Sequence, residues 1–510
     1  MLIDQDALHT LGDVPRYHAQ HRPQRTALLF EGRATSWAEL DAHADAVACA
    51  LIAAGCGPGD RVVFVGKGSD RFFELLFGAV RTGVVLVPVQ WRLAPAEITG
   101  IVADAEPRCV FADAGFAEDA PNRVAMAGFG AWRDAAPAAP LPDVAPGDVA
   151  IQLYTSGTTG APKGVMLSHH NLLAGRRAAA EAELSWNRWQ DDDLALVAMP
   201  LGHIGGVGWG LVALYQGATA LIHREFVPAA VLDALSDGAV SKVFLVPTAI
   251  QMLLMLPDAR TRSYPVLRDM LYGASPIALD LLREAGAVFG CAFAQQYGMT
   301  ETCGTIVHLP PEDHVPQGNE RMRGAGRAMP GVELRIVDPQ SRAVLPPGSF
   351  GEVETRSSAN MVGYWRRPDA TAETVDAEGW LRTGDAGVID EDGYLAIKDR
   401  FKDLIVSGAE NISPAEVESA VFGHPAVADV AVIGVPDAIW GEAVKALVVL
   451  KPGAPADAEG IIAFARTRIA AFKAPKSVEF VDALPRNPSG KVLRRVLRDP
   501  YWAGTDRGVN

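Results

Sequence analysis

Short apolar, strand-like runs alternate with helical segments through the first half of the chain, and this alternation restricts the possible folds more than any other feature. Residues 61–65 and 84–89 are strand-like, whereas residues 35–55 and 70–80 have helical spacing. The rhythm continues with a strand-like run at residues 242–247. Strands joined by helical crossovers form mainly parallel sheets. We therefore predict an α/β protein whose large N-terminal part consists of βαβ-type subdomains.

The pattern changes twice in the second half of the chain. Residues 324–400 consist of short strand-like runs separated by Gly and Pro turns, which predicts a β-rich subdomain. After Arg400 two helical segments, residues 416–421 and 461–472, are mixed with strand-like runs. A chain of 510 residues is too long for one core. We therefore expect a small α+β C-terminal domain that begins near Arg400.

Composition excludes several classes of function. A net charge of −15 argues against nucleic acid as a main partner. Five cysteines without metal-ligand spacing predict a reducing, cytoplasmic location and no structural zinc, and the N-terminus lacks the pattern of a signal peptide. Residues 194–223 contain no Asp, Glu, Lys or Arg, but their glycines, proline and histidines favour a strand–loop–helix beside a cavity over a transmembrane span.

One glycine-rich loop, residues 154–164, directly follows the apolar run at residues 149–153. It combines four Ser/Thr hydroxyls, three glycines and Lys163. Backbone N–H groups of such a loop can surround a phosphate, with the lysine as a point charge. The loop is not a Walker motif, because Pro162 stands where that motif needs glycine. We expect a nucleotide site of another kind.

Further motifs follow in order along the chain. They are Gln296-Tyr297-Gly298-Met299-Thr300-Glu301, Trp380-Leu381-Arg382-Thr383-Gly384-Asp385, Lys398-Asp399-Arg400-Phe401-Lys402-Asp403, Ser407-Gly408-Ala409-Glu410 and Pro488-Ser489-Gly490-Lys491. With the glycine-rich loop, they make nearly the whole chain resemble the adenylate-forming superfamily of acyl-CoA synthetases, adenylation domains and beetle luciferases. The resemblance implies an N-terminal domain at residues 1–399, a hinge at residues 400–403 and a mobile domain at residues 404–510.

The resemblance implies a first half-reaction in which a carboxylate attacks ATP to form an acyl-adenylate. Tyr297 would stack on adenine, Asp385 and Arg400 would contact the ribose, Glu301 would bind Mg²⁺, and Lys491 would bridge the carboxylate and the α-phosphate. The remaining residues that it places around the nucleotide are Thr155, Ser156, Gly157, Thr158, Thr159, Gly160, Lys163, Gly273, Ala274, Ser275, Gln296, Gly298, Met299 and Thr300.

In the implied second half-reaction the small domain rotates about Lys402 and coenzyme A attacks the adenylate. Residues Ser407, Gly408, Ala409 and Glu410 would then line the path of the pantetheine arm. Trp440 and Phe472 would flank the adenine of coenzyme A, and Arg92 would meet its phosphate. A core position is the alternative for both aromatic residues.

The acyl group is expected beside residues 199–210. His203 would orient the reacting acid, although Gly202 replaces the aromatic residue that relatives carry, and a buried structural histidine is the alternative. Gly205, Gly206, Val207 and Trp209 would line the pocket opposite residues 273–275. Trp209 could instead belong to the core. No Asp lies between residues 194 and 222, and Gln295 stands where malonate activators place arginine. A pocket without fixed charge favours an apolar tail.

These observations predict an ATP-dependent carboxylic acid–CoA ligase for medium-chain or branched aliphatic acids. An aryl-acid–CoA ligase and an acyl-AMP ligase that loads a carrier protein remain alternatives, although the insertion typical of the latter is not apparent. A non-catalytic nucleotide sensor would be expected to lack Glu301 or Lys491, and both are present. The acid itself and the oligomeric state, a homodimer included, stay open.

Overall fold

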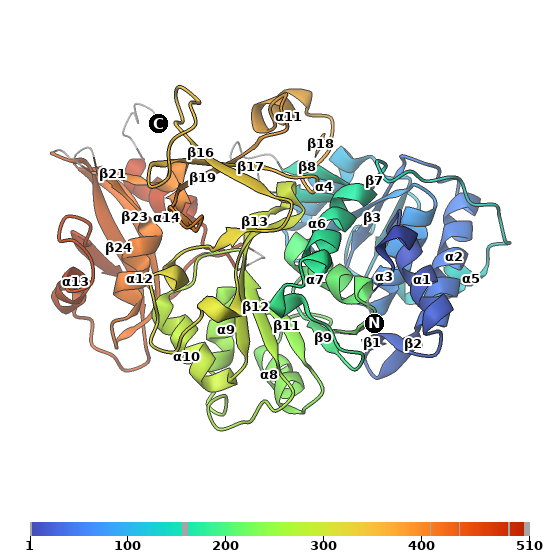
Figure 1. Ribbon diagram of the computed structural model, residues 1–510, viewed down its shortest axis with the longest axis horizontal. Coiled ribbons are helices and arrows are strands. Elements are labelled where there is room, and N and C mark those ends of the chain that lie inside the picture. Colours follow the sequence, from blue (N-terminus) through green and yellow to red (C-terminus); the bar gives the residue numbers. More distant parts are fainter. Residues whose placement is uncertain (1–2, 156–161, 408–409, 438, 488–489, 504–510) are drawn as a thin grey trace.

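The computed structural model describes residues 3–155, 162–407, 410–437, 439–487 and 490–503, with the backbone but not the side chain of Lys402. It consists of a large N-terminal part with two long sheets and a small C-terminal domain at one end (Figure 1). The mixed α/β architecture predicted from the sequence is confirmed. Among the described residues, no helix has both the length and the apolar character needed to cross a membrane.

A seven-stranded sheet carries the glycine-rich loop at the end of one strand. Strands β3 and β4 are buried along their whole length, which explains why their sequences are apolar without alternation. Pairing is parallel except where β8 joins β7 and β18. In spatial order the strands are β18 (Gly363–Tyr364), β8 (Lys163–Ser168), β7 (Val149–Thr155), β4 (Val85–Val89), β3 (Arg61–Val65), β5 (Cys109–Ala112) and β6 (Arg123–Ala125).

A nine-stranded sheet carries the tyrosine motif. Its central strands from β1 to β13 pair in parallel, and antiparallel strands complete both edges. In spatial order the strands are β15 (Arg327–Ala328), β14 (Gly304–Leu309), β13 (Ala292–Met299), β12 (Asp269–Gly273), β11 (Lys242–Leu245), β9 (Leu194–Val197), β10 (Thr219–Ile222), β1 (Thr26–Phe30) and β2 (Arg33–Ser36).

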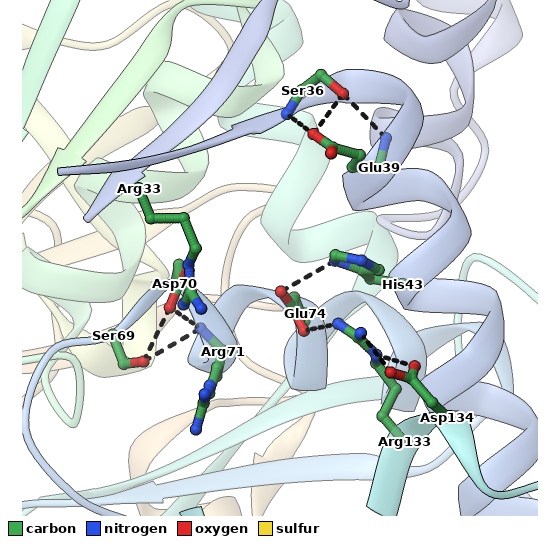
Figure 2. Close-up of polar contacts among 10 residues, drawn as sticks. All are labelled: Arg33, Ser36, Glu39, His43, Ser69, Asp70, Arg71, Glu74, Arg133 and Asp134. Carbon is green, nitrogen blue, oxygen red and sulfur yellow. Dashed lines mark hydrogen bonds and ion pairs between the residues drawn. The ribbon is translucent and has the colours of Figure 1, made fainter. Parts of the chain in front are cut away.

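The predicted helix at residues 35–55 shows how local sequence sets an element. Helix α2 (Trp37–Ala53) begins with a capping box in which the Ser36 hydroxyl accepts the Glu39 N–H and the Glu39 carboxylate accepts the Ser36 N–H (Figure 2). The buried carboxylate of Glu74 on α3 (Asp70–Arg81) then accepts from His43 at 3.1 Å and from Arg133 at 2.8 Å. This network joins α2 and α3 to α5 (Phe129–Asp134).

Helices α6 (His169–Glu181) and α7 (Ile204–Tyr215) matter most for the site. Helix α6 contacts β8, and α7 contacts β9, β10 and β14. The segment at residues 194–223 is therefore the strand–loop–helix that its composition predicts. The other N-terminal helices are α1 (Asp13–His21), α4 (Pro95–Ala105), α8 (Pro228–Ser236), α9 (Pro247–Leu254), α10 (Leu279–Phe289) and α11 (Pro368–Thr374).

A four-stranded antiparallel sheet connects the two parts of the chain. Its strands are β16 (Glu333–Val337), β17 (Phe350–Arg356), β19 (Leu381–Ile389) and β20 (Leu395–Arg400). The small domain follows with its own core, which includes Ile405, Val417 and Ile461. It contains β21 (Ile405–Ser407), β22 (Glu410–Ile412), β23 (Val427–Asp437), β24 (Gly441–Leu450), β25 (Ser477–Phe480), α12 (Pro414–Phe422), α13 (Ala458–Arg466) and α14 (Arg494–Trp502).

One predicted element of the small domain is wrong in its bounds. The helix expected at residues 461–472 is α13, which begins earlier and ends at Arg466. Asp457 caps its first turn, and the Thr467 hydroxyl donates to the Phe464 carbonyl at 2.7 Å, where the helix stops. Phe472 therefore lies outside the helix, and its side chain is 46% exposed.

Candidate active site

A cleft of about 260 Å³ lies where the small domain meets the large one. The large part contributes Ala274, Ser275 and residues 295–298, and the small domain contributes residues from α12 and residues 490–494. Most of the motifs that are dispersed in the sequence therefore meet in one place.

Three side chains, one from β13 of the nine-stranded sheet and two from β19 and β20 of the four-stranded sheet, form a charged centre in this cleft. The Tyr297 hydroxyl donates to Asp385 Oδ2 at 2.6 Å, and Arg400 Nε lies 2.6 Å from Asp385 Oδ1. Asp385 and Arg400 are partners in the β19–β20 register. Burial, followed by the Asp385 charge, raises the pKa of Tyr297 far above its ordinary value. Each carboxylate oxygen has two lone pairs, so Asp385 can still accept hydrogen bonds from a ligand.

Lys491 enters the same cleft from the loop before α14. Its backbone N–H donates to Asn487 Oδ1 at 2.9 Å. Partial desolvation by the walls of the cleft, and next the charge of Arg400, lowers the pKa of the Lys491 ammonium group, although the residue as a whole remains exposed. The preceding Gly490 has φ +84°, and a Cβ there would lie 2.6 Å from Thr248 Oγ1 on α9. Glycine at this position therefore permits the close approach of the two domains.

The glycine-rich loop at residues 154–164 is described only in part. The predicted phosphate ligands Ser156, Gly157, Thr158, Thr159 and Gly160 lie outside the described residues. Its two ends are described: Thr155 and Lys163 are paired in the β7–β8 ladder. Lys163 Nζ lies 4.9 Å from the ring centroid of Tyr364, and the Tyr364 hydroxyl donates to Glu301 Oε1 at 2.9 Å. Sequence reasoning missed Tyr364, for which the run Gly363-Tyr364-Trp365 gives only a weak signal.

Glu301 is the predicted magnesium ligand, and its carboxylate has the chemistry that this role requires. Glu301 is 6% exposed, follows the tyrosine motif and accepts one hydrogen bond, from Tyr364. No group of three or more His, Cys, Asp or Glu side chains is placed for a metal within the described ranges. A single hard carboxylate suits Mg²⁺ that is held mainly by substrate phosphates and water.

A second, mostly apolar cavity of about 160 Å³ lies between α6, α7 and β14. Its lining shares Ala274, Gln296 and Gly298 with the nucleotide cleft. Backbone packs against backbone at this junction. A Cβ at Gly298 would lie 1.8 Å from the Gly304 carbonyl oxygen, and one at Gly273 would lie 2.0 Å from that of Gln296. The shared wall is where an acyl group and a nucleotide would meet.

The helical phase of α7 corrects part of the predicted pocket. Gly205 and Trp209 line the cavity, together with Ile204 and Gly208, which sequence reasoning missed. Gly206 and Val207 are not among the residues that line this cavity, and their assignment to the acyl pocket stays a prediction. Residues 204, 208 and 212 share one helix face, whereas a Cβ at Gly206 would lie 2.1 Å from the Pro200 carbonyl oxygen on the other side.

A charged side chain also lines this cavity, so the expectation of a pocket without fixed charge is wrong. Arg176 on α6 contributes to the lining. The charged residues that distinguish amino-acid and malonate activators are expected at residues 194–222 and 295–296, and α6 lies outside both ranges. The cavity is apolar in most of its wall and cationic at one point.

His203 is the N-cap residue of α7 rather than part of either cavity lining described above. Its Nε2 atom is buried and has no hydrogen-bond partner among the described residues. Burial lowers the pKa of its imidazole to about 4, so the ring is neutral at pH 7. A neutral imidazole can orient a carboxyl group, but that role stays a prediction.

The residues expected to bind coenzyme A lie at or near the surface. Ser407 pairs with Glu410 in the β21–β22 hairpin and with Gly441 in β24, which places the turn carrying Trp440 next to this hairpin. Trp440 is 53% exposed. Arg92 is bound to Glu225 at 3.4 Å and lies over the Trp91 ring. Gly408 and Ala409 lie outside the described residues, and the role of Lys402 as a hinge stays a prediction.

A nucleotide cleft between two domains, joined to an apolar cavity, defines an AMP-forming enzyme that activates carboxylic acids. The chain belongs to the AMP-binding enzyme family: the family model matches residues 16–365, and the model of the AMP-binding enzyme C-terminal domain matches residues 416–491. It is an acid–thiol ligase of the acyl-CoA synthetase type.

Individual relatives cover nearly the whole chain. The fatty acid–[acyl-carrier-protein] ligase ScoC of Streptomyces coeruleorubidus is 43% identical over 99% of this chain and 98% of its own. The feruloyl-CoA synthase of an Amycolatopsis species is 40% identical over 96% and 98%. The crystal structure of ATP-bound MatB from Rhodopseudomonas palustris superimposes with a TM-score of 0.86 at 33% identity, over 96% of this chain and 99% of that chain.

Proposed function

We propose that the enzyme joins a medium-chain or branched aliphatic carboxylic acid to coenzyme A through an acyl-adenylate. The observation that carries this proposal is the shared wall of Ala274, Gln296 and Gly298 between the nucleotide cleft and the acyl cavity. A carboxyl group held there faces both the acyl pocket and the cleft that Lys491 enters. A location in a reducing, cytoplasmic compartment fits the five free cysteines.

In the first half-reaction two anions must approach each other, so preplaced positive charge is needed. Lys491 would bridge the carboxylate and the α-phosphate, while Asp385 and Arg400 hold the ribose. Thr155, Lys163, Met299 and Thr300 belong to segments that would surround the phosphates. Mg²⁺ held by Glu301 would neutralise phosphate charge and orient the pyrophosphate leaving group.

In the second half-reaction the small domain would turn about Lys402. Lys491 would leave the cleft, and the hairpin from Ser407 to Glu410 would replace it beside the adenylate. Trp440, Phe472 and Arg92 would hold the nucleotide part of coenzyme A. The free thiol has a pKa near ~8.5, so its positioning matters more than its basicity.

A carrier protein is a second candidate for the acyl acceptor. The observation that favours it is the 43% identity to a relative named as an acyl-carrier-protein ligase. Both acceptors carry the acyl chain on a pantetheine thiol, so the same expected path of the pantetheine arm beside the Ser407–Glu410 hairpin would serve either. An aryl acid is the second candidate for the substrate, because a feruloyl-CoA synthase is 40% identical.

The test is a panel of aliphatic and aryl acids incubated with the enzyme, ATP and Mg²⁺, with pyrophosphate release as the readout. Coenzyme A and a phosphopantetheinylated carrier protein are then supplied separately, and the products are weighed by mass spectrometry. We expect acid-dependent pyrophosphate release and acyl-CoA formation. Pyrophosphate release without acyl-CoA, but with acylated carrier protein, would transfer the function to the second acceptor. No acid-dependent release from any acid would contradict the proposal.

A further inference from the structure

Arg176 is a cation that projects from α6 into the acyl cavity. Its Nη2 donates to the Gly208 carbonyl on α7 at 3.0 Å, and its Nη1 donates to the Leu172 carbonyl one turn earlier. A Cβ at Gly208 would lie 3.9 Å from Nη2, so the guanidinium lies directly against this glycine of α7. Nε is buried and has no partner among the described residues. The guanidinium also has a side-chain hydrogen bond with Cys303. Because a guanidinium has five N–H donors, these contacts leave others available to a ligand.

The charge of Arg176 has no carboxylate partner. No ion pair includes it among the residues that the structure describes. Buried arginines are treated in two ways elsewhere in the chain: Arg81, with a side chain only 2% exposed, forms ion pairs with Asp41 and Asp45, whereas the buried Arg61 donates to Gln152 and to the Gly59 carbonyl and faces no cavity described above. An unpaired buried charge is costly, so an arginine that faces a cavity without a counterion points to an anionic ligand.

The polar groups around Arg176 do not supply that charge. Cys303, which directly precedes β14, also lines the cavity, but burial raises the pKa of its thiol to about 11, so the group is neutral at pH 7. Burial likewise raises the pKa of the Tyr215 hydroxyl. Asn171, Gln216 and the threonines of the lining carry no charge. Burial lowers the pKa of Arg176 itself, as expected for a cation that lacks a counterion.

We propose that Arg176 determines acyl specificity by binding a second carboxylate on the chain of the substrate, so that the enzyme prefers dicarboxylic over monocarboxylic acids. The proposal rests on the proposed function. The reacting carboxyl group lies at the junction of Ala274, Gln296 and Gly298, and the second carboxylate accepts hydrogen bonds from the guanidinium across the apolar cavity. Charge-assisted hydrogen bonds of this kind are the strong ones, and guanidinium geometry suits a carboxylate.

The neighbouring Arg177 provides a matched control. It lies on the same helix, and its Nη2 donates to the backbone carbonyls of Gln5 and Leu8 at 3.0 and 3.1 Å. It therefore also fastens α6 to other backbone segments, but it does not line the cavity. A loss of activity that follows only from weaker packing of α6 should appear in variants of either arginine.

The experiment compares Arg176→Met, Arg176→Lys and Arg177→Met with the wild type. Pyrophosphate release is measured for succinate, glutarate, adipate and suberate against butanoate, pentanoate, hexanoate and octanoate. We expect the wild type to prefer the dicarboxylate at one chain length. For that pair, the ratio of kcat/KM values should fall by about 10- to 100-fold in Arg176→Met, fall less in Arg176→Lys and stay fixed in Arg177→Met.

Two results would overturn the inference while leaving the ligase function intact. The first is a wild type that uses every methyl-ended acid better than its dicarboxylate counterpart, and this result needs no variant to fold. The second is a folded Arg176→Met that loses activity equally on both acids, as a purely structural clamp would. If no acid at all releases pyrophosphate from the wild type, the proposed function fails first and the inference fails with it.

Discussion

The nucleotide cleft and the acyl cavity meet at Ala274, Gln296 and Gly298, but they are built from different parts of the chain. The cleft lies between two domains, and it contains the ion pairs of Asp385 with Arg400 and of Asp399 with Arg494, whereas Lys491 has no ion pair among the described residues. The cavity lies within the large domain between α6, α7 and β14. Its charge is unpaired. Changes in the cleft should therefore act on individual half-reactions, whereas changes in the cavity should act on the choice of acid.

The largest effect is expected for Lys491→Ala. Loss of a charge that stabilises the transition state should lower adenylation by about 10²–10³-fold. Thioester formation from synthetic acyl-AMP and coenzyme A should remain, because in the proposed mechanism the lysine leaves the cleft before that step. Lys451→Ala, at an exposed position of the same domain, is the control. Equal loss of both half-reactions in a folded protein would contradict the role of Lys491.

The opposite selectivity is expected for Lys402→Pro. Proline fixes φ and removes an N–H, so rotation of the small domain should be restricted. Adenylation should persist, while thioester formation should fall by about 100-fold because the thiol is no longer positioned. Lys402→Ala changes the side chain but leaves φ free. Normal thioester formation in the proline variant would contradict the role of Lys402 as the hinge.

A change in the cavity should act on specificity alone. Trp209 lines the cavity, but it is only 6% exposed and its Nε1 donates to the Leu196 carbonyl at 2.9 Å. It therefore belongs both to the cavity wall and to the hydrophobic core. Trp209→Ala should shift preference towards longer chains by roughly 1–3 kcal/mol. The measurement is the ratio of kcat/KM values for dodecanoate and octanoate, or for the corresponding dicarboxylates. An unchanged ratio in a stable variant would assign Trp209 to the core only.

The smallest effect is expected for Gly490→Ala, which tests the domain contact itself. A left-handed φ costs a residue with a Cβ roughly 1–2 kcal/mol, and the new methyl group would meet Thr248. Adenylation should fall by about 10-fold, and Thr248→Ala should restore part of it. Gly453→Ala is the control, because φ is +77° there and nothing lies within 4 Å. Equal effects at Gly453 and Gly490 would show that strain alone, rather than the domain contact, is responsible.

Local signals made much of this molecule predictable. The capping box of Ser36 and Glu39 fixes the start of α2 within four residues, and uninterrupted apolar runs identify the central strands β3 and β4. The motif residues of the cleft could be grouped in advance through the family resemblance. The carboxylate network of Tyr297, Asp385 and Arg400 then adds distances that no sequence contains.

The acyl cavity was harder to predict because it depends on how two helices are rotated against each other. Arg176 and Arg177 are adjacent in the sequence, and only the docking of α6 decides which of them faces the cavity. The same holds for Gly205 and Gly206 on α7. Tyr364 could not be assigned either, because its contacts with Lys163 and Glu301 join three distant segments.

The backbone packing at the junction has a consequence for how such an enzyme can acquire new substrates. Gly273 and Gly298 each lie against a carbonyl oxygen at a distance that no larger residue tolerates. Mutation can therefore hardly alter the point where the reacting carboxyl group is proposed to lie. Evolution and protein engineering retain freedom on the inner faces of α6 and α7, where Arg176 and Trp209 lie. New specificity should arise there, several carbon atoms away from the bond that is made.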